Sequence, residues 1–338
     1  MAERVSPGGV IALEAPLGRR LGAEFLGTLL FVAVGAGTAA AIGLGSTLGR
    51  LQKLTEALQA QGGPPTTDPV LKALFTETGI VGSLPVALAF GFALAVLVYA
   101  LGGVSGAHFN PAVTFALAVA RRFRWVEVPM YWLVQCAGGI AGAFIVVGIY
   151  NSGADNPAAG AMYGATTIAA GVEDWNAILA EAFIAFILMT AIMAVAVDPR
   201  APKGWSGLVI GLGLVAGILV TGPVTGGSAN FARSLGPFVA SMIKDVAKIP
   251  WNDLIAYAVG PLVGASAAAL IYDSITGLET ASPAPSPGAA TNDEDVYNRP
   301  VTPATGGSTV PPGLAPTGDA PASSTPPGLA PTSEDPGV

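Results

Sequence analysis

Two stretches of this 338-residue chain, 120 residues apart, decide its fold. The first reads Ser105-Gly106-Ala107-His108-Phe109-Asn110-Pro111-Ala112-Val113, and the second reads Thr225-Gly226-Gly227-Ser228-Ala229-Asn230-Phe231-Ala232-Arg233. In each, Asn stands before an apolar run, and Asn is a favoured helix N-cap. Pro111 suits the first helical position, where its missing N–H costs nothing. At 1.5 Å per residue the first helix, over 113–120, reaches about 15 Å with its Asn-Pro-Ala start, half of a bilayer core. The second helix, over 231–242, is also too short to cross.

The composition indicates a membrane protein. Only 11% of residues are Asp, Glu, Lys or Arg, whereas soluble globular domains carry about 25%. Hydrophobic residues make up 52%, and 45 glycines are spread through the apolar stretches, as in closely packed membrane helices. Residues 280–338 hold six acids and Arg299, so they account for −5 of the net charge of −7. The remainder is nearly neutral, so binding to nucleic acid has no electrostatic support.

Six stretches approach the roughly 20 apolar residues that span a bilayer. They lie at 22–44, 84–103, 126–149, 177–197, 205–222 and 251–273. Six spans place both termini on one side. Basic residues gather in the segment 1–21 and after spans two and four, whereas the connection between spans three and four has none. The positive-inside bias therefore predicts cytoplasmic termini, and the segment 1–21 lacks the apolar core of a cleavable signal.

The two halves of the chain form a duplication. Besides the two quoted stretches, Ala23-Glu24 in the first span matches Ala180-Glu181 in the fourth. Because each half has three spans, an odd number, the repeats must have opposite orientations. The two short helices then enter from opposite sides and meet near the midplane. Non-helical backbone at that depth requires burial in protein or a water-filled cavity, which favours a pore.

The chemistry of such a pore follows from the two helix N-termini. Each carries about half a positive charge, which repels cations, and Asn110 and Asn230 offer side-chain N–H groups to a passing oxygen. Neutral hydrogen-bonding molecules are expected to pass, whereas ions and protons are not.

The sequence resembles the aquaporin (major intrinsic protein) family over about residues 20–275. The resemblance rests on Ala-Glu-Phe-Leu-Gly-Thr at 23–28, Ser-Gly-Ala-His-Phe-Asn-Pro-Ala-Val-Thr at 105–114 and Gly-Gly-Ser-Ala-Asn-Phe-Ala-Arg-Ser-Leu-Gly-Pro at 226–237. It implies an all-α membrane protein with six spans, two re-entrant half-helices, an inverted 3+3 repeat and a homotetrameric assembly. It also implies a passive water channel. One departure is Phe231 where the family usually has Pro, which changes the residues that pack between the half-helix tips: Pro111, Ala112, Phe231 and Ala232.

The resemblance also implies an outer constriction. Counting from the two Asn residues, it assigns Phe90, Ile218, Gly227 and Arg233 to this filter. Water-restricted members usually have His where this chain has Ile218, so the opening is expected to be wider and less polar, with leak of small neutral solutes such as glycerol. Ser234 follows Arg233 where glycerol channels typically have Asp, which is an opposing signal.

Three further residues have two interpretations each. Glu24 and Glu181 lie early in apolar spans, where a carboxylate is costly. By resemblance they hydrogen-bond the re-entrant backbone and hold the Asn residues in place, while a proton-coupled carrier would titrate them. His108, the single histidine, is a candidate pH gate, although a structural role is favoured.

Other functions find less support. A secondary carrier predicts acids or cation sites near the midplane, and a formate/nitrite-type channel would lack the two Asn-led motifs. Gly204-Trp205-Ser206-Gly207 resembles the motif of intramembrane serine proteases, yet no His follows Ser206. With one cysteine and one histidine, no metal, cofactor or enzymatic activity is expected.

Two segments lie outside the predicted spans. Residues 280–338 contain 13 prolines and are predicted to be a disordered cytoplasmic tail. Residues 45–83 are predicted to form a long extracytoplasmic loop with a short amphipathic helix near 51–58. The channel domain is accordingly assigned to residues 22–275, in the plasma membrane.

Overall fold

A computed structural model describes residues 15–45, 69–150, 157–246 and 249–278. These residues fall in one compact unit, Met1–Pro285. The predicted amphipathic helix near 51–58 and the Pro-rich tail from residue 280 lie outside the described residues.

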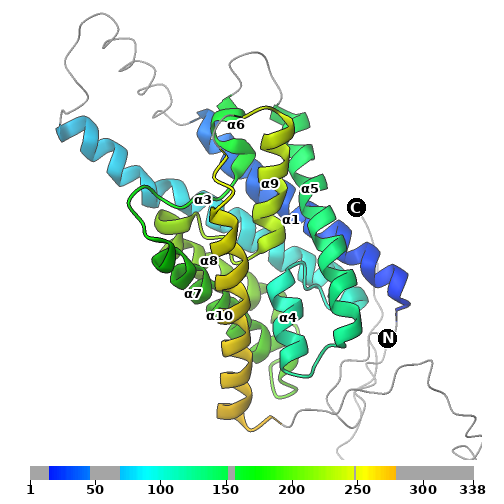
Figure 1. Cartoon of the computed structure of the whole chain (residues 1–338). Helices are drawn as coiled ribbons and strands as arrows, with labels where there is room; N and C mark the ends of the chain where they lie inside the picture. Colours follow the sequence, from blue (N-terminus) through cyan, green and yellow to red (C-terminus); the bar gives the residue numbers. More distant parts are fainter. Residues whose placement is uncertain (1–14, 46–68, 151–156, 247–248, 279–338) are drawn as a thin grey trace, which may run out of the picture. The chain divides into compact units, whose positions relative to one another are not determined.

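The described residues form long helices, half-length helices and a few short turns (Figure 1). Six are long and apolar enough to cross a membrane, and they coincide with the six predicted spans. They are α1 (Leu17–Gly45), α3 (Pro69–Ser105), α5 (Val128–Tyr150), α7 (Asp174–Ile192), α8 (Ser206–Thr225) and α10 (Asp253–Thr276). Two half-length helices are α4 (Pro111–Val119) and α9 (Phe231–Ile243). The remaining short elements are the 3-10 turns η1 (Trp125–Glu127) and η2 (Met162–Gly164), α6 (Pro157–Gly160), and the π-helical turn η3 (Met193–Val197), which continues α7.

Helix α3 is longer than the span that it contains. It begins at Pro69, within residues 45–83, which are predicted to form an extracytoplasmic loop. Proline is favoured at a first helical position, and the residues that follow, Leu71 to Leu74, are strong helix formers. Only the part from Ser83 onward is apolar enough to span. Hydropathy located the span correctly but not the start of the helix that contains it.

The helices pack in pairs that repeat between the two halves. Helix α1 packs on α5, and α7 packs on α10, while α3 and α8 pack on each other across the halves. Each half-helix packs on a span of the other half, α4 on α10 and α9 on α5. In Figure 1 the two half-helices extend in opposite directions from the centre, as an inverted repeat requires. A Cβ at Gly211 of α8 would meet the Gly91 carbonyl of α3, so small residues permit this close crossing.

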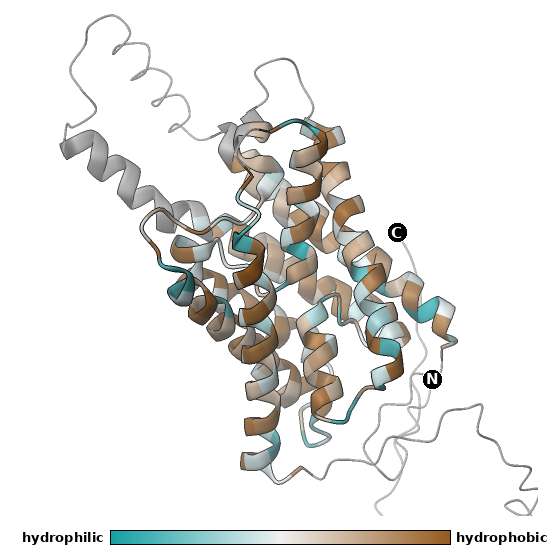
Figure 2. Ribbon diagram, viewed as in Figure 1, coloured by the Kyte–Doolittle hydropathy of each residue, from teal (hydrophilic) through white to brown (hydrophobic). Residues whose placement is uncertain are grey.

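The surface of the bundle is apolar. Figure 2 shows hydrophobic residues along the long helices, and large side chains on them are exposed, among them Leu133 (70%), Ile149 (66%) and Val96 (64%). Lipid, rather than water, suits such a surface. The chain is therefore an integral, multi-pass membrane protein.

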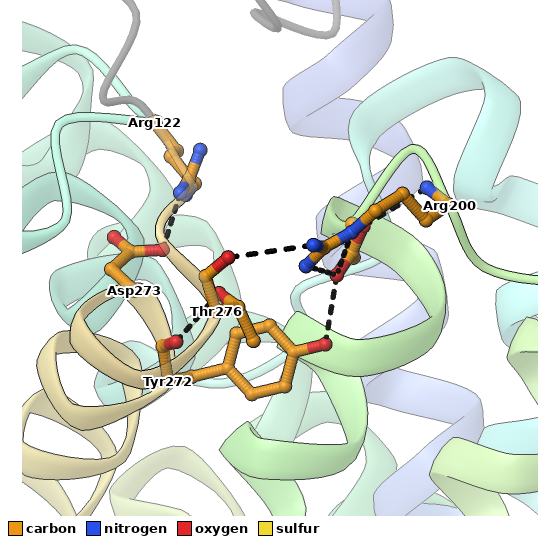
Figure 3. Close-up of polar contacts among 6 residues, drawn as sticks. Arg122, Arg200, Tyr272, Asp273 and Thr276 are labelled. Carbon is orange, nitrogen blue, oxygen red and sulfur yellow. Dashed lines mark hydrogen bonds and ion pairs between the residues drawn. The ribbon is translucent and has the colours of Figure 1, made fainter.

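Polar contacts hold the C-terminal end of α10 (Figure 3). Asp273 forms an ion pair with Arg122, which follows the half-helix α4. Tyr272 donates a hydrogen bond to Asp198 (3.0 Å), and Arg200 donates to the Thr276 carbonyl (3.4 Å). Hydrogen bonds from Arg200 also hold the pKa of Asp198 well below its usual range. The last turn of α10 is thus fixed to the loops that follow α4 and η3.

Candidate functional site

The N-termini of the two half-helices meet and bond to each other. Asn110 Nδ2 donates to the Ala229 carbonyl and Asn230 Nδ2 donates to the Phe109 carbonyl, each at 2.8 Å. Both Asn residues are buried, 4% and 2% exposed. The contact is reciprocal, so each tip orients the other.

Each Asn also caps its own helix. Asn110 Oδ1 accepts from the Ala112 N–H at 2.9 Å. Asn230 Oδ1 accepts from the N–H groups of Ala232 (3.0 Å) and Arg233 (3.3 Å). An Asn side chain has two N–H donors and one carbonyl oxygen. With the oxygen used by the cap and one N–H used across the tips, one N–H of each Asn remains for another acceptor.

The loops before the two helices have the same backbone conformation. Positive φ occurs at Gly106, Ala107 and Phe109 in the first loop (90°, 52° and 49°). It recurs at the matching positions Gly226, Gly227 and Ala229 (77°, 62° and 55°). Left-handed φ at residues other than Gly is strained and persists only where contacts impose it.

Two buried carboxylates supply those contacts. Glu24 accepts the N–H groups of His108 (3.0 Å) and Phe109 (2.7 Å). Glu181 accepts those of Ser228 (3.0 Å) and Ala229 (2.7 Å). Glu24 also accepts a hydrogen bond from the Ser105 hydroxyl, and Glu181 accepts one from the Thr225 hydroxyl, each at 2.6 Å. Glu24 accepts a fourth bond, from Gln135 Nε2 (2.8 Å).

His108 is buried beside the first tip. Its Nδ1 lies 3.1 Å from Thr114 Oγ1, and its ring contacts Phe123 with the ring centroids 4.9 Å apart. Thr114 in turn donates to the Asn110 carbonyl (3.1 Å) and accepts from Gln135 (3.0 Å).

Ser228 and Ser234 occupy the matching positions of the second half. Their hydroxyl oxygens lie 2.6 Å apart, and Ser228 donates to the Asn230 carbonyl at 2.9 Å. Ser234 has a further partner, Thr166 Oγ1, at 2.7 Å.

The four residues assigned to the filter form two contacting pairs. The Arg233 guanidinium lies over the Phe90 ring, 4.6 Å from its centroid. Gly227 packs on Ile218, where a Cβ would lie 3.1 Å from the Ile218 Cα. Arg233 Nη1 also donates to the Gly164 carbonyl (3.1 Å). Phe90, Ile218 and Arg233 are each at most 2% exposed.

Sequence reasoning missed several supporting residues. Tyr131 donates to the Ser105 carbonyl (3.0 Å) and Tyr257 to the matching Thr225 carbonyl (2.7 Å). The duplication carried a signal for Ser105 and Thr225, because a hydroxyl opens each quoted stretch. Nothing in the sequence indicated Gly164 and Thr166, since both lie in a connection far from the motifs.

Comparison with known proteins agrees with this geometry. The family described as Major intrinsic protein matches residues 13–272. The chain is similar to Aquaporin AqpM of Methanothermobacter marburgensis, with 40% identity over 77% of this chain and 98% of that one. It is also similar to Aquaporin NIP2-2 of Zea mays, with 36% identity over 58% and 61% of the two chains. Among solved structures, the aquaglyceroporin from Plasmodium falciparum shares the fold, with a TM-score of 0.62 and 21% identity over 77% of this chain and 97% of that one.

The fold and the paired tips define a six-span helical channel with two re-entrant half-helices. The chain belongs to the major intrinsic protein family. It is a passive channel rather than an enzyme, and the formate/nitrite-type alternative no longer applies.

Proposed function

We propose that the chain conducts water between the two Asn-capped tips and also passes small neutral solutes such as glycerol. The observation that carries this proposal is the pair of crossed bonds from Asn110 to Ala229 and from Asn230 to Phe109. These bonds leave one N–H of each Asn to donate to a passing oxygen.

Exclusion of ions rests on two features of the same path. Two helix N-termini point at one another, and each contributes about half a positive charge. Arg233 adds a buried full charge, and its Nε has no hydrogen-bond partner among the described residues. Arg233 thus offers a donor to a neutral molecule and repels a cation.

Passage of solutes larger than water follows from the residues proposed to line the constriction. Phe90 and Ile218 are apolar, and Gly227 contributes no side chain. Water-restricted members carry a His at the position of Ile218. This chain therefore lacks that hydrogen-bonding ring in the path. The result is a wider and less polar opening, bounded by Phe90 and Arg233.

Glu24 and Glu181 are proposed to support the loops. Both are fully buried, and their carboxylate oxygens are occupied by donors from the loop that each one faces. A proton carrier would need to break these bonds in each cycle. This arrangement favours a static role and a channel over a carrier.

His108 is proposed to be a structural partner of Thr114 rather than a gate. In that case His108→Gln, which preserves a hydrogen-bonding side chain, leaves the ratio of water flux at pH 5.5 to that at pH 7.5 equal to the parent's. A pH response that disappears in this variant would assign the gate to His108.

Proteoliposome swelling, with water flux measured by an osmotic jump and glycerol flux by the slower re-swelling, tests the function directly. We expect rapid water flux, glycerol flux above that of empty liposomes, and no proton current under a pH gradient. Absence of water flux from correctly inserted protein would overturn the proposal, and proton-coupled uptake would favour the carrier.

The assembly and orientation are proposed to be a homotetramer in the plasma membrane with both termini cytoplasmic. An even number of spans among the described residues supports termini on one side, and the basic connections favour the cytoplasm for them. Residues 280–338 are proposed to be dispensable. A chain ending at Thr280 is expected to retain its number of subunits in native mass spectrometry and its water flux per channel.

A further inference from the structure

The connection between α6 and α7 is attached at four points to the half-helix α9, the end of α8 and the start of α10. The Gly164 carbonyl accepts from Arg233 (3.1 Å), and Thr166 bonds to Ser234 (2.7 Å). Beyond these, the Ala169 N–H donates to the Val224 carbonyl (2.9 Å), and the Ile168 N–H donates to Asp253 (2.8 Å). The Thr166 contact is the one of the four made between two neutral side chains.

The hydroxyl groups around Ser234 form a chain with a fixed direction. Ser228 donates its single proton to the Asn230 carbonyl (2.9 Å), so it must accept from Ser234 (2.6 Å). Ser234 has then used its own proton and must accept from Thr166. All three are at most 3% exposed, so water does not replace a missing member at low cost.

The two halves share one side-chain contact beside the tip but differ in the residue that bonds to it. In each half, the residue two positions before the capping Asn bonds to the residue four positions after it. These pairs are His108 with Thr114 and Ser228 with Ser234. In the first half the third partner is Gln135, on a membrane span. In the second half it is Thr166, in the connection that also carries Gly164.

Gly164 lies two residues before Thr166 and cannot shift freely. Its φ is +82°, and a Cβ there would meet the carbonyl of Ala36 on α1. The backbone at Gly164 therefore packs closely on α1. The residues that follow Gly164 are fixed by the bond from the Thr166 hydroxyl to Ser234. The Gly164 carbonyl accepts a hydrogen bond from the same guanidinium of Arg233 that lies over Phe90.

We propose that Thr166 and Ser234 are positioning residues that set the width of the constriction by fixing the Gly164 carbonyl against Arg233. This inference rests on the proposed role of Arg233 in the filter. Loss of the hydroxyl bond frees the connection, lets the guanidinium move away from its place over Phe90 and admits glycerol more easily relative to water.

The test measures the ratio of glycerol to water permeability per inserted channel in proteoliposomes. The variants are Thr166→Val, Thr166→Ser, Ser234→Ala and the double variant that combines Thr166→Val with Ser234→Ala. Thr166→Val removes one donor and leaves no buried donor unpaired, so it is the cleanest change. We expect the ratio to rise at least about threefold, the size of effect that loss of one neutral hydrogen bond supports. Thr166→Ser should keep the parent ratio. The double variant should match Ser234→Ala, because Ser234→Ala already removes the Thr166–Ser234 bond together with the Ser228–Ser234 bond.

A merely structural role would lower the water and glycerol fluxes together and leave their ratio unchanged, and this result would overturn the inference. Additive effects in the double variant would also overturn it. If Ser234→Ala does not insert, the comparison of Thr166→Val with Thr166→Ser decides alone. Arg233→Val in the same assay separates the two proposals. If Arg233→Val changes the ratio and Thr166→Val does not, only the positioning role fails. If neither changes it, the filter assignment fails.

Discussion

The two half-helices share their caps, loop backbones and buried carboxylates, yet the surroundings of their tips differ. Around the first tip, Thr114 bonds to Gln135, and Gln135 also bonds to Glu24. Around the second, Ser234 bonds to Thr166, and the same connection accepts Arg233 through Gly164. The duplicated part of each half builds the meeting of the tips. The part that differs contacts Arg233, which is proposed to form the charged and size-limiting end of the path, so selectivity is expected to lie there.

The largest expected effect comes from removing the carboxylates that both halves share. Glu181→Ala leaves the buried N–H groups of Ser228 and Ala229 without acceptors, at about 1–3 kcal/mol each, or about 2–6 kcal/mol in total. Glu24→Ala should lower stability further, since Gln135 also loses one of its two acceptors. Thermal unfolding in detergent measures both, with the exposed Glu173→Ala as the control. A larger loss for Glu181→Ala than for Glu24→Ala would contradict this ranking.

A smaller but more specific effect is expected from placing a charge at each tip. Asn110→Asp and Asn230→Asp lose the crossed bond and add a negative charge, which attracts a monovalent cation by about 4 kcal/mol at 4 Å for an effective dielectric constant of about 20. Arg233 lies three residues after Asn230 and offsets the charge there. Cation leak, measured by potassium flux into liposomes, should therefore be greater for Asn110→Asp. Equal leak in the two variants would mean that Arg233 does not shape the field at the tips.

These comparisons rest on features that the sequence carried to different degrees. The spans, half-helices and Asn caps were predictable, because apolar length and a capping residue are local signals. The buried acids were found because carboxylates are conspicuous in apolar spans. Gly164 and Thr166 were not found, because their roles depend on how a distant connection folds back. Similarly, the start of α3 at Pro69 was missed because hydropathy does not report helix outside the apolar region.

The next change tests whether selectivity lies in the second half. Ile218→His should narrow the constriction and lower glycerol flux at least about tenfold, equivalent to about 1.4 kcal/mol of added barrier, with a smaller effect on water. The matched control is Val98→His, because Val98 lies 12 residues before Asn110 as Ile218 does before Asn230. Stopped-flow water and glycerol permeabilities should give an unchanged ratio for the control variant. A similar drop in both variants would place the selective step outside the second half.

The smallest expected effect comes from giving the second tip the Asn-Pro-Ala sequence of the first. Asn230 caps the N–H groups of Ala232 and Arg233, the second and third helical residues, so the N–H that Phe231→Pro removes is not one of the capped pair. Proline also presets the φ that a first helical residue needs. Stability should change by no more than about 1 kcal/mol, and the water flux per channel should stay within a few-fold of the parent. Ala232→Pro is the matched control, since it removes the N–H that donates to Asn230 Oδ1 and places a larger side chain where Ala232 is completely buried. Thermal unfolding and stopped-flow permeability of both variants measure the difference. If Phe231→Pro proved as damaging as Ala232→Pro, the phenylalanine ring itself would be required for the tips to pack, and the two halves would differ at their meeting point as well as around it.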